Sequence, residues 1–338
     1  MKIGVIGATG MIGHHTAKAV LERGHELTVI HRKNSKLSLL NDLSFEAAEA
    51  DLSDEAALTK AFAGLDAIIH CAAYYPSEPR PLKEDVRLAR LQMDTFLSAC
   101  EAAKGLKKIV YTGGSIALPK ALDGSHGTEE LTYRSAPSIK NAYLHVKYEM
   151  DKMARERASE NLPIVIGIPV MCFGEYDYGP STGQLIAEVA NETLPAYLEG
   201  KRNVVYTGDA GRGLVLAAEK GRIGERYLFA GSNIAMSVLV PKIAMLAGVK
   251  PPRVILPLPA AKIIASFLSA KQRLLGGPSP KLSKTAVAVM GLGQFINGSK
   301  AQRELGYSPS LTLDETLERT LDWFVQEGYI KDKGEGTS

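Results

Sequence analysis

Two tyrosine–lysine pairs stand in one short stretch of the sequence, NAYLHVKYEMDKMARE, which begins at Asn141. Tyr143 precedes Lys147 by four residues, and Tyr148 precedes Lys152 by four. Positions four apart share a face of a helix, so either pair could act on one ligand. A tyrosine hydroxyl can donate a proton to a bound ligand or remove one from it. A lysine ammonium within reach favours the phenolate, so we expect it to lower the tyrosine pKa from its usual value near ~10.

Both pairs cannot face the same site. At roughly 100° per residue the second pair lies about 140° further round the helix than the first. Tyr143 comes just after the SIKNA segment and near the expected start of the helix. We therefore assign the chemistry to Tyr143 and Lys147. We interpret Tyr148 and Lys152 as residues that lie at the edge of the core and on the solvated face of the helix. His145, between the first pair, is interpreted as a packed or exposed histidine.

A glycine-rich turn, GATGMIG, lies between an apolar strand, KIGVIG, and a helix expected from about Met11 to Arg23. Its three glycines are spaced three apart, which allows a tight turn and close approach of the backbone to a pyrophosphate, while the helix N-terminus offers unpaired N–H groups. The context predicts a dinucleotide site, and the alternative is an ordinary tight turn. The residues expected to contact the cofactor here are Gly7, Thr9, Gly10, Met11, Ile12 and Gly13.

A basic cluster follows the second expected strand. An acidic residue normally holds the free ribose 2′-hydroxyl of NAD at this place. Here His31 takes the acid's place and Arg32, Lys33 and Lys36 follow it. An arginine can bind a 2′-phosphate through charge-assisted hydrogen bonds, whereas a carboxylate would repel it. The cluster therefore favours NADP(H) over NAD. The alternative, strongest for the two lysines, is a solvated charged loop.

The elements that must position these residues alternate through the first half of the chain. Apolar runs such as ELTVIH, AIIHCAA, KKIVYTGG and PIVIGIPV are separated by helical patterns. Continuous apolar strands between helices indicate an α/β fold with a doubly wound parallel sheet, the Rossmann arrangement. We expect residues 1–170 to form an NADP-binding domain that segments near 203–232 complete. Residues 171–202 and 233–330 are expected to form a smaller substrate-binding region that caps the carboxyl edge of the sheet without an independent core, and 331–338 a flexible tail.

The composition argues against several function classes. The 338 residues carry 40 Lys and Arg against 37 Asp and Glu, a net charge of +3, which does not point to nucleic acid or an anionic membrane. Cys71, Cys100 and Cys172 lack the paired spacings of a zinc site or a disulfide framework, so we predict buried thiols and no metal. The chain opens directly into a strand and a turn, which suggests a cytoplasmic protein.

The most apolar later segment, LPAAKIIASFLSAKQRLL, does not predict a membrane span. It is interrupted by Lys262, Lys271 and Arg273 and falls short of the ~20 apolar residues that a span needs. We expect a small-molecule carbonyl or alcohol substrate as the partner. A homodimer is compatible with the sequence.

Nearly the whole sequence resembles the extended short-chain dehydrogenase/reductase family. GATGMIG is similar to the glycine motif of that family, and YLHVK resembles its Tyr-x-x-x-Lys pair. ADL, which ends at Leu52, resembles the segment whose aspartate, here Asp51, meets the adenine. HCAA, which begins at His70, resembles the fourth-strand motif that lines the cofactor. The segments LPAYLEGKRNVVYTGDAGRG and INGSKAQRELGYSPS are similar to the epimerase/dehydratase-like, dihydroflavonol-4-reductase-like branch. Beyond the glycine turn, the cofactor contacts that the resemblance and the basic cluster imply are His31, Arg32, Asp51, Leu52, Cys71, Ala72, Ala73, Tyr143, Lys147 and Pro169.

The sequence departs from the family pattern at two places. Ala89 stands where the family usually has an asparagine, which puts a water relay in doubt. In IVYTGGSIAL, Gly114 stands where a hydroxyl is expected, and Ser115 comes one place later. The paired glycines before Ser115 give the backbone freedom to bring this serine forward. We predict that Ser115 joins Tyr143 and Lys147 as a catalytic residue, with Thr112 as the alternative donor.

These residues predict an NADP-dependent carbonyl reductase or alcohol dehydrogenase. Its expected substrate is a fairly apolar ketone or aldehyde, because the C-terminal region is rich in segments such as PLPAAKIIASFLSA. One rival is a nucleotide-sugar epimerase or dehydratase, which would need cations for a second pyrophosphate, and Arg202, Arg212 and Arg253 are its candidates. Another is a non-catalytic NADP-sensing protein, whose expected sign is a damaged tyrosine or lysine, and both residues are present.

Overall fold

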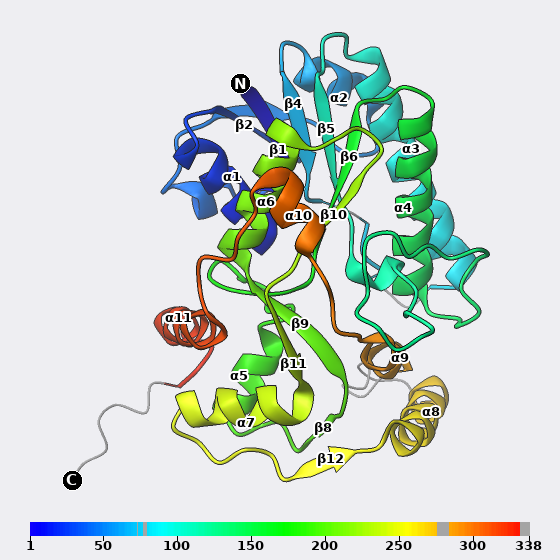
Figure 1. The fold of residues 1–338 in the computed structure, drawn as a ribbon, viewed down its shortest axis with the longest axis vertical. Coiled ribbons are helices and arrows are strands. Elements are labelled where there is room, and N and C mark those ends of the chain that lie inside the picture. The colour runs from blue at the N-terminus through cyan, green and yellow to red at the C-terminus, as the bar shows by residue number, and fades with distance from the viewer. Residues whose placement is uncertain (73, 77–79, 276–283, 332–338) are drawn as a thin grey trace.

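A parallel sheet of seven strands forms the centre of the larger part of the molecule (Figure 1). The computed structural model describes residues 1–72, 74–76, 80–275 and 284–331. The strands follow one another across the sheet in the order β10-β6-β5-β4-β1-β2-β3, and each neighbouring pair is parallel. Their bounds are β1 Lys2–Ile6, β2 Glu26–His31, β3 Glu46–Glu49, β4 Ala67–His70, β5 Lys108–Thr112, β6 Ile164–Pro169 and β10 Arg226–Phe229. The predicted doubly wound parallel sheet is confirmed.

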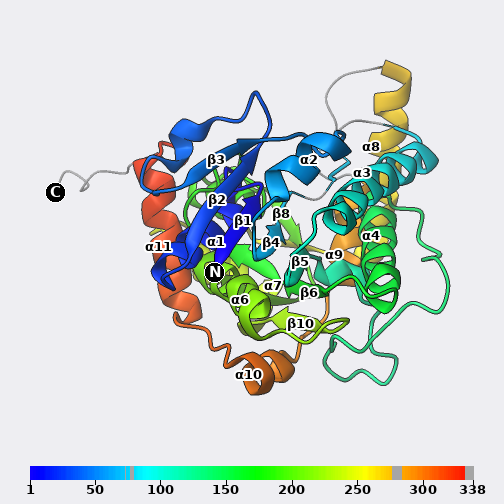
Figure 2. The ribbon, with the colours of Figure 1, turned by 90° about the horizontal axis from the view of Figure 1, so that it is seen from above.

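Helices cover both faces of this sheet, as the view from above shows (Figure 2). On one face α1 packs against α6, and on the other α3 packs against both α2 and α4. The bounds are α1 Met11–Glu22, α2 Glu55–Phe62, α3 Leu82–Ala102, α4 Ala142–Ser159 and α6 Thr207–Lys220, with α10 Ser299–Leu305 beside α6. Two short 3₁₀ helices, η1 Leu37–Leu40 and η2 Ser115–Ala117, lie in the connections.

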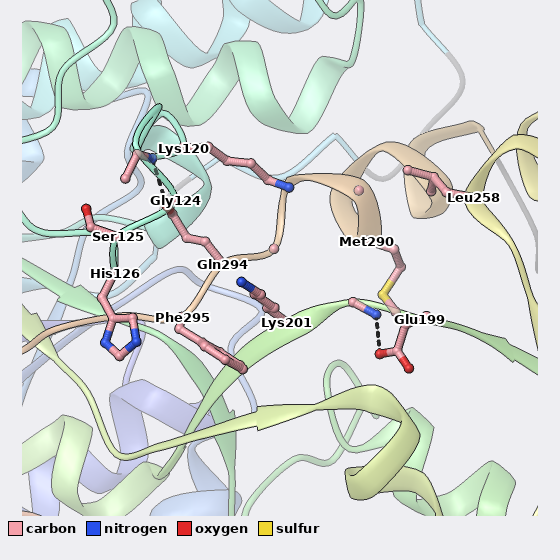
Figure 3. A pocket seen from close by; sticks show the side chains of 14 residues that line it. Lys120, Gly124, Ser125, His126, Glu199, Lys201, Leu258, Met290, Gln294 and Phe295 are labelled. Atoms are coloured by element: carbon pink, nitrogen blue, oxygen red, sulfur yellow. Dashed lines mark hydrogen bonds between the residues drawn. The ribbon is translucent and has the colours of Figure 1, made fainter.

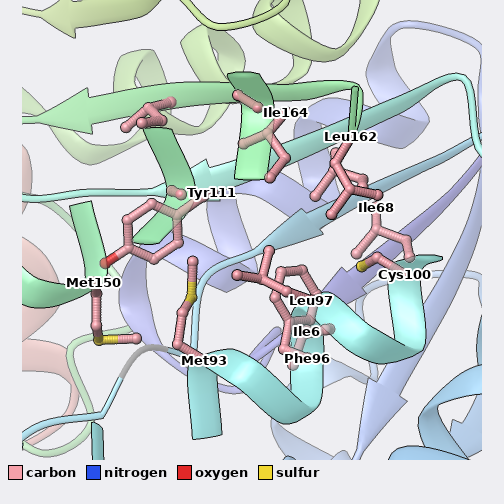
Figure 4. Close-up of a cluster of buried hydrophobic side chains, with 14 of the residues drawn as sticks. Ile6, Ile68, Met93, Phe96, Leu97, Cys100, Tyr111, Met150, Leu162 and Ile164 are labelled. Atoms are coloured by element: carbon pink, nitrogen blue, oxygen red, sulfur yellow. The ribbon is translucent and has the colours of Figure 1, made fainter. Parts of the chain in front are cut away.

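The apolar strands are buried because each faces a layer of helices on both sides. In the cluster between the sheet and α3 (Figure 4), Ile68 and Ile164 of the sheet meet Phe96 of α3 and Met150 of α4. Phe96 also packs edge to face on Phe62 of α2, with ring centroids 6.0 Å apart. This packed layer supports the sheet, at whose carboxyl edge the candidate site lies.

A smaller region lies below that edge in Figure 1. It contains a three-stranded sheet in the order β11-β9-β7 and a two-stranded parallel pair, β12 with β8. Its strands are β7 Met171–Phe173, β8 Ala196–Leu198, β9 Lys201–Tyr206, β11 Ser232–Ala235 and β12 Val254–Leu256. Its helices are α5 Gln184–Ala190, α7 Met236–Leu246, α8 Leu258–Leu275, α9 Lys284–Leu292 and α11 Leu313–Gln326.

The smaller region has a buried cluster of its own, in contrast to the cap without an independent core that the sequence suggested. Phe173 of β7, Leu239 of α7 and Phe324 of α11 are fully buried together. The helix α11 begins with a capping box in which the Thr312 side chain and Glu315 exchange hydrogen bonds, which stabilises its first turn. Segments far apart in the sequence therefore supply a second core.

Two expectations fall partly outside the described residues. Ala73 and residues 332–338 of the tail are not among them. Within the part of the chain that the structure describes, no helix is long and apolar enough to cross a membrane, and no group of three or more His, Cys, Asp or Glu side chains could hold a metal ion.

Candidate active site

Tyr143 and Lys147 lie in the first turns of α4, at the carboxyl edge of the sheet. The helix starts here because the Asn141 side chain accepts a hydrogen bond of 2.9 Å from the backbone N–H of Leu144, an N-cap that satisfies one of the free donors of the first turn. The Lys147 ammonium lies 6.0 Å from the centroid of the Tyr143 ring. The predicted pair is thus side by side, and both side chains are partly buried.

The pKa of Tyr143 departs from the expectation. Burial raises the pKa of this phenol to about 12, and the nearby Tyr75 and Cys172 act in the same direction. The predicted lowering of this pKa is therefore wrong for the protein alone, because the loss of water around the phenolate disfavours the charged form. Tyr143 consequently holds its proton at neutral pH, which is the form that can donate it.

The described residues around Lys147 supply no counterion to its ammonium group. Burial lowers the pKa of Lys147 to about 8, and no ion pair of this lysine is found among the described residues. Its neighbour His70 is fully buried and neutral, since burial and the nearby Lys147 lower the pKa of the imidazole to about 3. Gly114 lies on another side of the lysine, where an added Cβ would be 3.6 Å from Cδ and Cε.

The second tyrosine–lysine pair lies elsewhere. Tyr148 packs edge to face on Tyr133, with ring centroids 5.8 Å apart, and the Lys152 ammonium lies 3.7 Å from a carboxylate oxygen of Glu156. His145 places its Nε2 3.1 Å from the carbonyl oxygen of Ile139. Each of these side chains already has a structural partner.

The loop after β5 carries the hydroxyl candidates. Thr112 ends β5, and its Oγ1 lies 3.5 Å from Sγ of Cys71. Ser115 begins η2, which packs against α4. Gly113 and Gly114 separate the two hydroxyl groups. The asparagine expected in α3 is replaced by Ala89, which is fully buried in the core.

The glycine turn forms a cradle that larger residues would fill. Gly7 has a φ of +84°, and a Cβ on it would lie 2.8 Å from Cβ of Ala72. A Cβ on Gly13 would overlap the carbonyl oxygen of Gly7. Gly10 caps α1 without a side-chain hydrogen bond, so the N–H groups of the first turn, at Met11, Ile12 and Gly13, have no intrahelical acceptor. Such a turn fits the pyrophosphate of a dinucleotide. Thr9 lies in the same turn, directly before the cap.

A polar pocket of about 390 Å³ lies beyond β2 and β3. Arg32 and Lys33 line it together with Asp51 and Glu49. Asp51 accepts hydrogen bonds from the backbone and hydroxyl of Ser53, which lower the pKa of the carboxyl group, and Arg32 adds a smaller effect in the same direction. The Nδ1 of His31 lies 3.1 Å from the carbonyl oxygen of Arg32, and the partly buried Leu52 packs against the core.

The remaining predicted cofactor residues end neighbouring strands. Cys71 and Ala72 follow β4, and Pro169 ends β6. Cys71 is partly exposed, whereas Cys100 and Cys172 are buried as predicted. Because the strands are parallel, the glycine turn, these residues and the loop after β5 all lie at one edge. The order of the strands reverses beside β1, where Gly7 meets Ala72, and this is the place at which open α/β sheets bind ligands.

A second pocket, of about 310 Å³, lies between the loop after η2 and β9. Lys120 enters it from that loop and Lys201 from β9, with Phe295 and Gln294 beside them (Figure 3). Burial and the nearby Arg202 and Lys201 lower the pKa of Lys120. Neither lysine could be identified from the sequence, because no spacing rule connects residues so far apart along the chain.

The three arginines named for a second pyrophosphate lie in different surroundings. Arg202 is close to the second pocket, where its guanidinium contacts the carbonyl oxygen and Sδ of Met290. Arg212 donates to Asp209 at 2.6 Å and to the carbonyl oxygen of Ser308 at 2.7 Å. Arg253 is exposed just before β12. Only Arg202 therefore lies beside a described pocket.

The chain is similar to known proteins in sequence and in fold. The sequence model of the NAD dependent epimerase/dehydratase family matches residues 3–230. The chain is 27% identical to a putative dihydroflavonol 4-reductase of Synechocystis sp., over 97% of this chain and 95% of that protein. It is 23% identical to the decarboxylating sterol-4-alpha-carboxylate 3-dehydrogenase of Mus musculus, over 96% of this chain and 91% of that protein. A solved nucleoside-diphosphate-sugar epimerase from Pseudomonas aeruginosa superposes with a TM-score of 0.86 at 39% identity, over 98% and 99% of the two chains.

Proposed function

The chain belongs to the NAD-dependent epimerase/dehydratase family, among the extended short-chain dehydrogenase/reductases, and from that membership we propose that this oxidoreductase is an NADP-dependent carbonyl reductase or alcohol dehydrogenase. Its site combines a proton donor, a partly buried cation and a glycine cradle at one edge of a parallel sheet. Tyr143, Lys147 and Ser115 are its proposed catalytic residues.

The observation that carries the proposal is the setting of Lys147. A buried ammonium without a carboxylate partner is costly unless a ligand supplies acceptors. The ribose hydroxyls of a nicotinamide nucleotide would supply them, and the glycine turn lies at the same edge of the sheet. The cradle at Gly7 and the free N–H groups of α1 support the same ligand.

The chemistry follows from the protonation states of the two side chains. The nicotinamide, when bound, supplies or accepts the hydride. Tyr143, whose pKa burial raises to about 12, would donate its proton to the carbonyl oxygen. The Lys147 ammonium would stabilise the phenolate that remains. A hydroxyl at Ser115 would stabilise the charge that builds on the carbonyl oxygen.

The choice of NADP rests on Arg32. This exposed side chain lines the pocket beyond β2, where no aspartate or glutamate follows the strand at once. Glu49, Asp51 and Asp54 line the same pocket, so the guanidinium must overcome three carboxylates to hold a 2′-phosphate. A bidentate, charge-assisted contact is the kind of interaction that can do so.

The substrate would lie between the sheet edge and the smaller region, and we assign substrate binding to residues 171–202 and 233–330. Tyr75 packs on Tyr143, with ring centroids 5.2 Å apart, and its largely exposed ring would cover one side of a bound carbonyl compound. The relatives named as a reductase and a sterol dehydrogenase support an apolar ketone or alcohol as the substrate class.

A nucleotide-sugar epimerase or dehydratase is the second candidate, and the pocket of Lys120 and Lys201 favours it. Two lysines with Arg202 nearby concentrate positive charge, which suits a diphosphate. The solved epimerase from Pseudomonas aeruginosa supports the same candidate. Glu199 is the one carboxylate among the side chains that line this pocket. The two lysines therefore give its lining a net positive charge.

One experiment separates the candidates. The protein is incubated with NADPH and a panel of ketones and aldehydes while NADPH absorbance is followed, and in parallel with nucleotide sugars whose products are separated by chromatography. Net oxidation of NADPH by an apolar carbonyl compound supports the reductase. Conversion of a nucleotide sugar without net NADPH consumption would establish the second candidate instead. Cofactor binding without turnover of either class would leave only a nucleotide-sensing role.

A further inference from the structure

Exposed apolar side chains are concentrated at one end of the molecule, where α7, β12 and α8 lie furthest from the seven-stranded sheet (Figure 1). Of the fourteen large apolar side chains that are exposed in the described part of the chain, eight lie between Val238 and Leu274. Scattered apolar residues on a surface need no explanation, but a cluster of this kind marks an interaction site.

The outer face of α8 carries the core of this cluster. Ile263, Phe267 and Leu274 are 72%, 70% and 84% exposed, and with Ala270 they follow the i, i+4, i+7, i+11 spacing of one helix face. The opposite face holds Ala261 and Ala265, which are fully buried in a small apolar cluster. The helix is therefore apolar on both sides, and its outer stripe has no cover among the described residues.

Lysines border the stripe on both sides. At roughly 100° per residue, Lys262 lies about 100° to one side of Ile263 and Lys271 about 80° to the other. Both lysines are exposed, as are Lys250 and Arg253 next to β12. None of the four makes an ion pair in the structure as described. Their charges are thus available to an external anion.

The sequence concentrates its positive charge in this region. From the start of β11 to the end of α9, residues 232–292, it contains eight Lys and Arg residues and no Asp or Glu. The whole chain has 40 basic and 37 acidic residues, so the other 277 residues hold 32 basic against 37 acidic ones, a formal charge of −5. The small net charge of +3 conceals this separation.

We propose that the outer face of α8, together with Val254 and Ile255 of β12, docks on the surface of a bilayer that contains anionic lipids. The apolar stripe would lie at the boundary of headgroups and acyl chains, and the bordering lysines would extend their ammonium groups to lipid phosphates. An apolar stripe bordered by lysines is the pattern of a helix that lies in the interface without spanning it. Such docking is independent of the reaction that the protein catalyses.

Charge complementarity favours this occupant over a second copy of the chain. Two copies joined through this face would bring the unpaired cations of both together, and like charges across an interface are unfavourable. An anionic lipid surface offers both an apolar layer and many negative groups. Leu258, at the start of α8, also lines the pocket of Lys120 and Lys201, so docking would hold that pocket close to the lipid.

Sedimentation with lipid vesicles tests the proposal. The full chain is mixed with vesicles of phosphatidylcholine alone, or of phosphatidylcholine with an equal amount of phosphatidylglycerol, at low and at high salt. We expect binding to the anionic vesicles that weakens with salt. Phe267→Ser should reduce the partition coefficient by at least about tenfold. Lys262→Gln with Lys271→Gln should reduce it by about fivefold for each charge.

Matched controls use exposed residues away from this end. Ile223→Ser and Lys104→Gln should bind vesicles as the parent protein does, and NADPH binding should be unchanged in every variant, which shows that each is folded. Absence of parent binding to anionic vesicles would overturn the proposal, and so would equal binding to both vesicle types. A dimer in solution that Phe267→Ser dissociates would assign the face to self-association instead.

Discussion

Gly114 lies beside the side chain of Lys147, and a Cβ added to Gly114 would be 3.6 Å from Cδ and Cε of the lysine. This is an ordinary van der Waals distance, and the φ of Gly114 is −148°, an extended conformation that any residue can adopt. Position 114 therefore has room for a serine beside Lys147. The backbone conformation therefore does not require glycine at position 114 and does not explain why a hydroxyl is missing there.

The first prediction concerns Ser115. If its hydroxyl stabilises the developing charge, Ser115→Ala should lower turnover by about ten- to a thousand-fold. Adding Gly114→Ser to that variant should restore at least about tenfold, because the new hydroxyl would stand where the family carries one. Steady-state kinetics with NADPH and the best carbonyl substrate measure both effects.

Gly113→Ser is the control for this rescue. A Cβ on Gly113 would meet Ile166 and Ile168 at 3.3 Å, so its side chain would point into the sheet core and not toward Lys147. It should give no rescue of Ser115→Ala. An unimpaired Ser115→Ala enzyme would remove the serine from the mechanism and leave the tyrosine–lysine pair in place.

The second prediction compares the two tyrosines of α4. Tyr143→Phe removes the proposed proton donor and should lower turnover by about a hundred- to ten-thousand-fold, while NADPH binding stays nearly unchanged. Tyr148→Phe should keep a rate close to that of the parent, because the ring packs on Tyr133. The reverse result would place the chemistry on the other face of the helix.

Much of the larger part of the molecule could be predicted because its signals are local. A continuous apolar run reports a strand buried on both faces, and a glycine turn between strand and helix needs only neighbouring residues. The placement of Tyr143 near the start of α4 follows in the same way, since Asn141 is a good N-cap. The pKa of Tyr143 could not be predicted, because it depends on how far the folded chain excludes water.

The smaller region was harder to predict because its contacts are not local. Phe173, Leu239 and Phe324 meet in one cluster although they come from three distant segments, and no periodicity links them. The apolar segment of α8 was visible in the sequence. Apolar residues have the same spacing in a helix whether their side chains face a core or solvent. The exposure of the Phe267 side chain could therefore be determined only from the structure.

The third prediction concerns the cofactor. Charge-assisted contacts from Arg32 to the 2′-phosphate should make NADPH bind about ten- to a hundred-fold more tightly than NADH. Arg32→Ala should narrow that difference, mainly by weakening NADPH. Fluorescence titration of both cofactors measures it. Lys36→Ala, outside the residues that line the pocket, should preserve the preference, and equal affinities in the parent protein would contradict the assignment to NADP.

The fourth prediction concerns pH. Burial lowers the pKa of Lys147 to about 8 in the protein alone, so the side chain is charged below that pH and neutral above it. A bound nucleotide should favour the charged form, because its hydroxyls and phosphates accept hydrogen bonds from an ammonium group. The affinity for NADPH should therefore be constant from neutral pH to about 8 and should fall as the pH rises further. Above neutral pH the 2′-phosphate, with a second pKa of about 6, no longer titrates.

Two substitutions of Lys147 separate this effect from other titrations. Lys147→Arg keeps its charge at all these pH values, so NADPH affinity should lose its dependence on pH. Lys147→Met should bind NADPH weakly at every pH, again without a break near 8. Calorimetry in buffers of different ionisation enthalpy should detect proton uptake when the parent protein binds NADPH above pH 8, and none with either variant. Persistence of the break in Lys147→Met would show that another group titrates, and an affinity equal to that of the parent protein would show that Lys147 has no part in holding the cofactor.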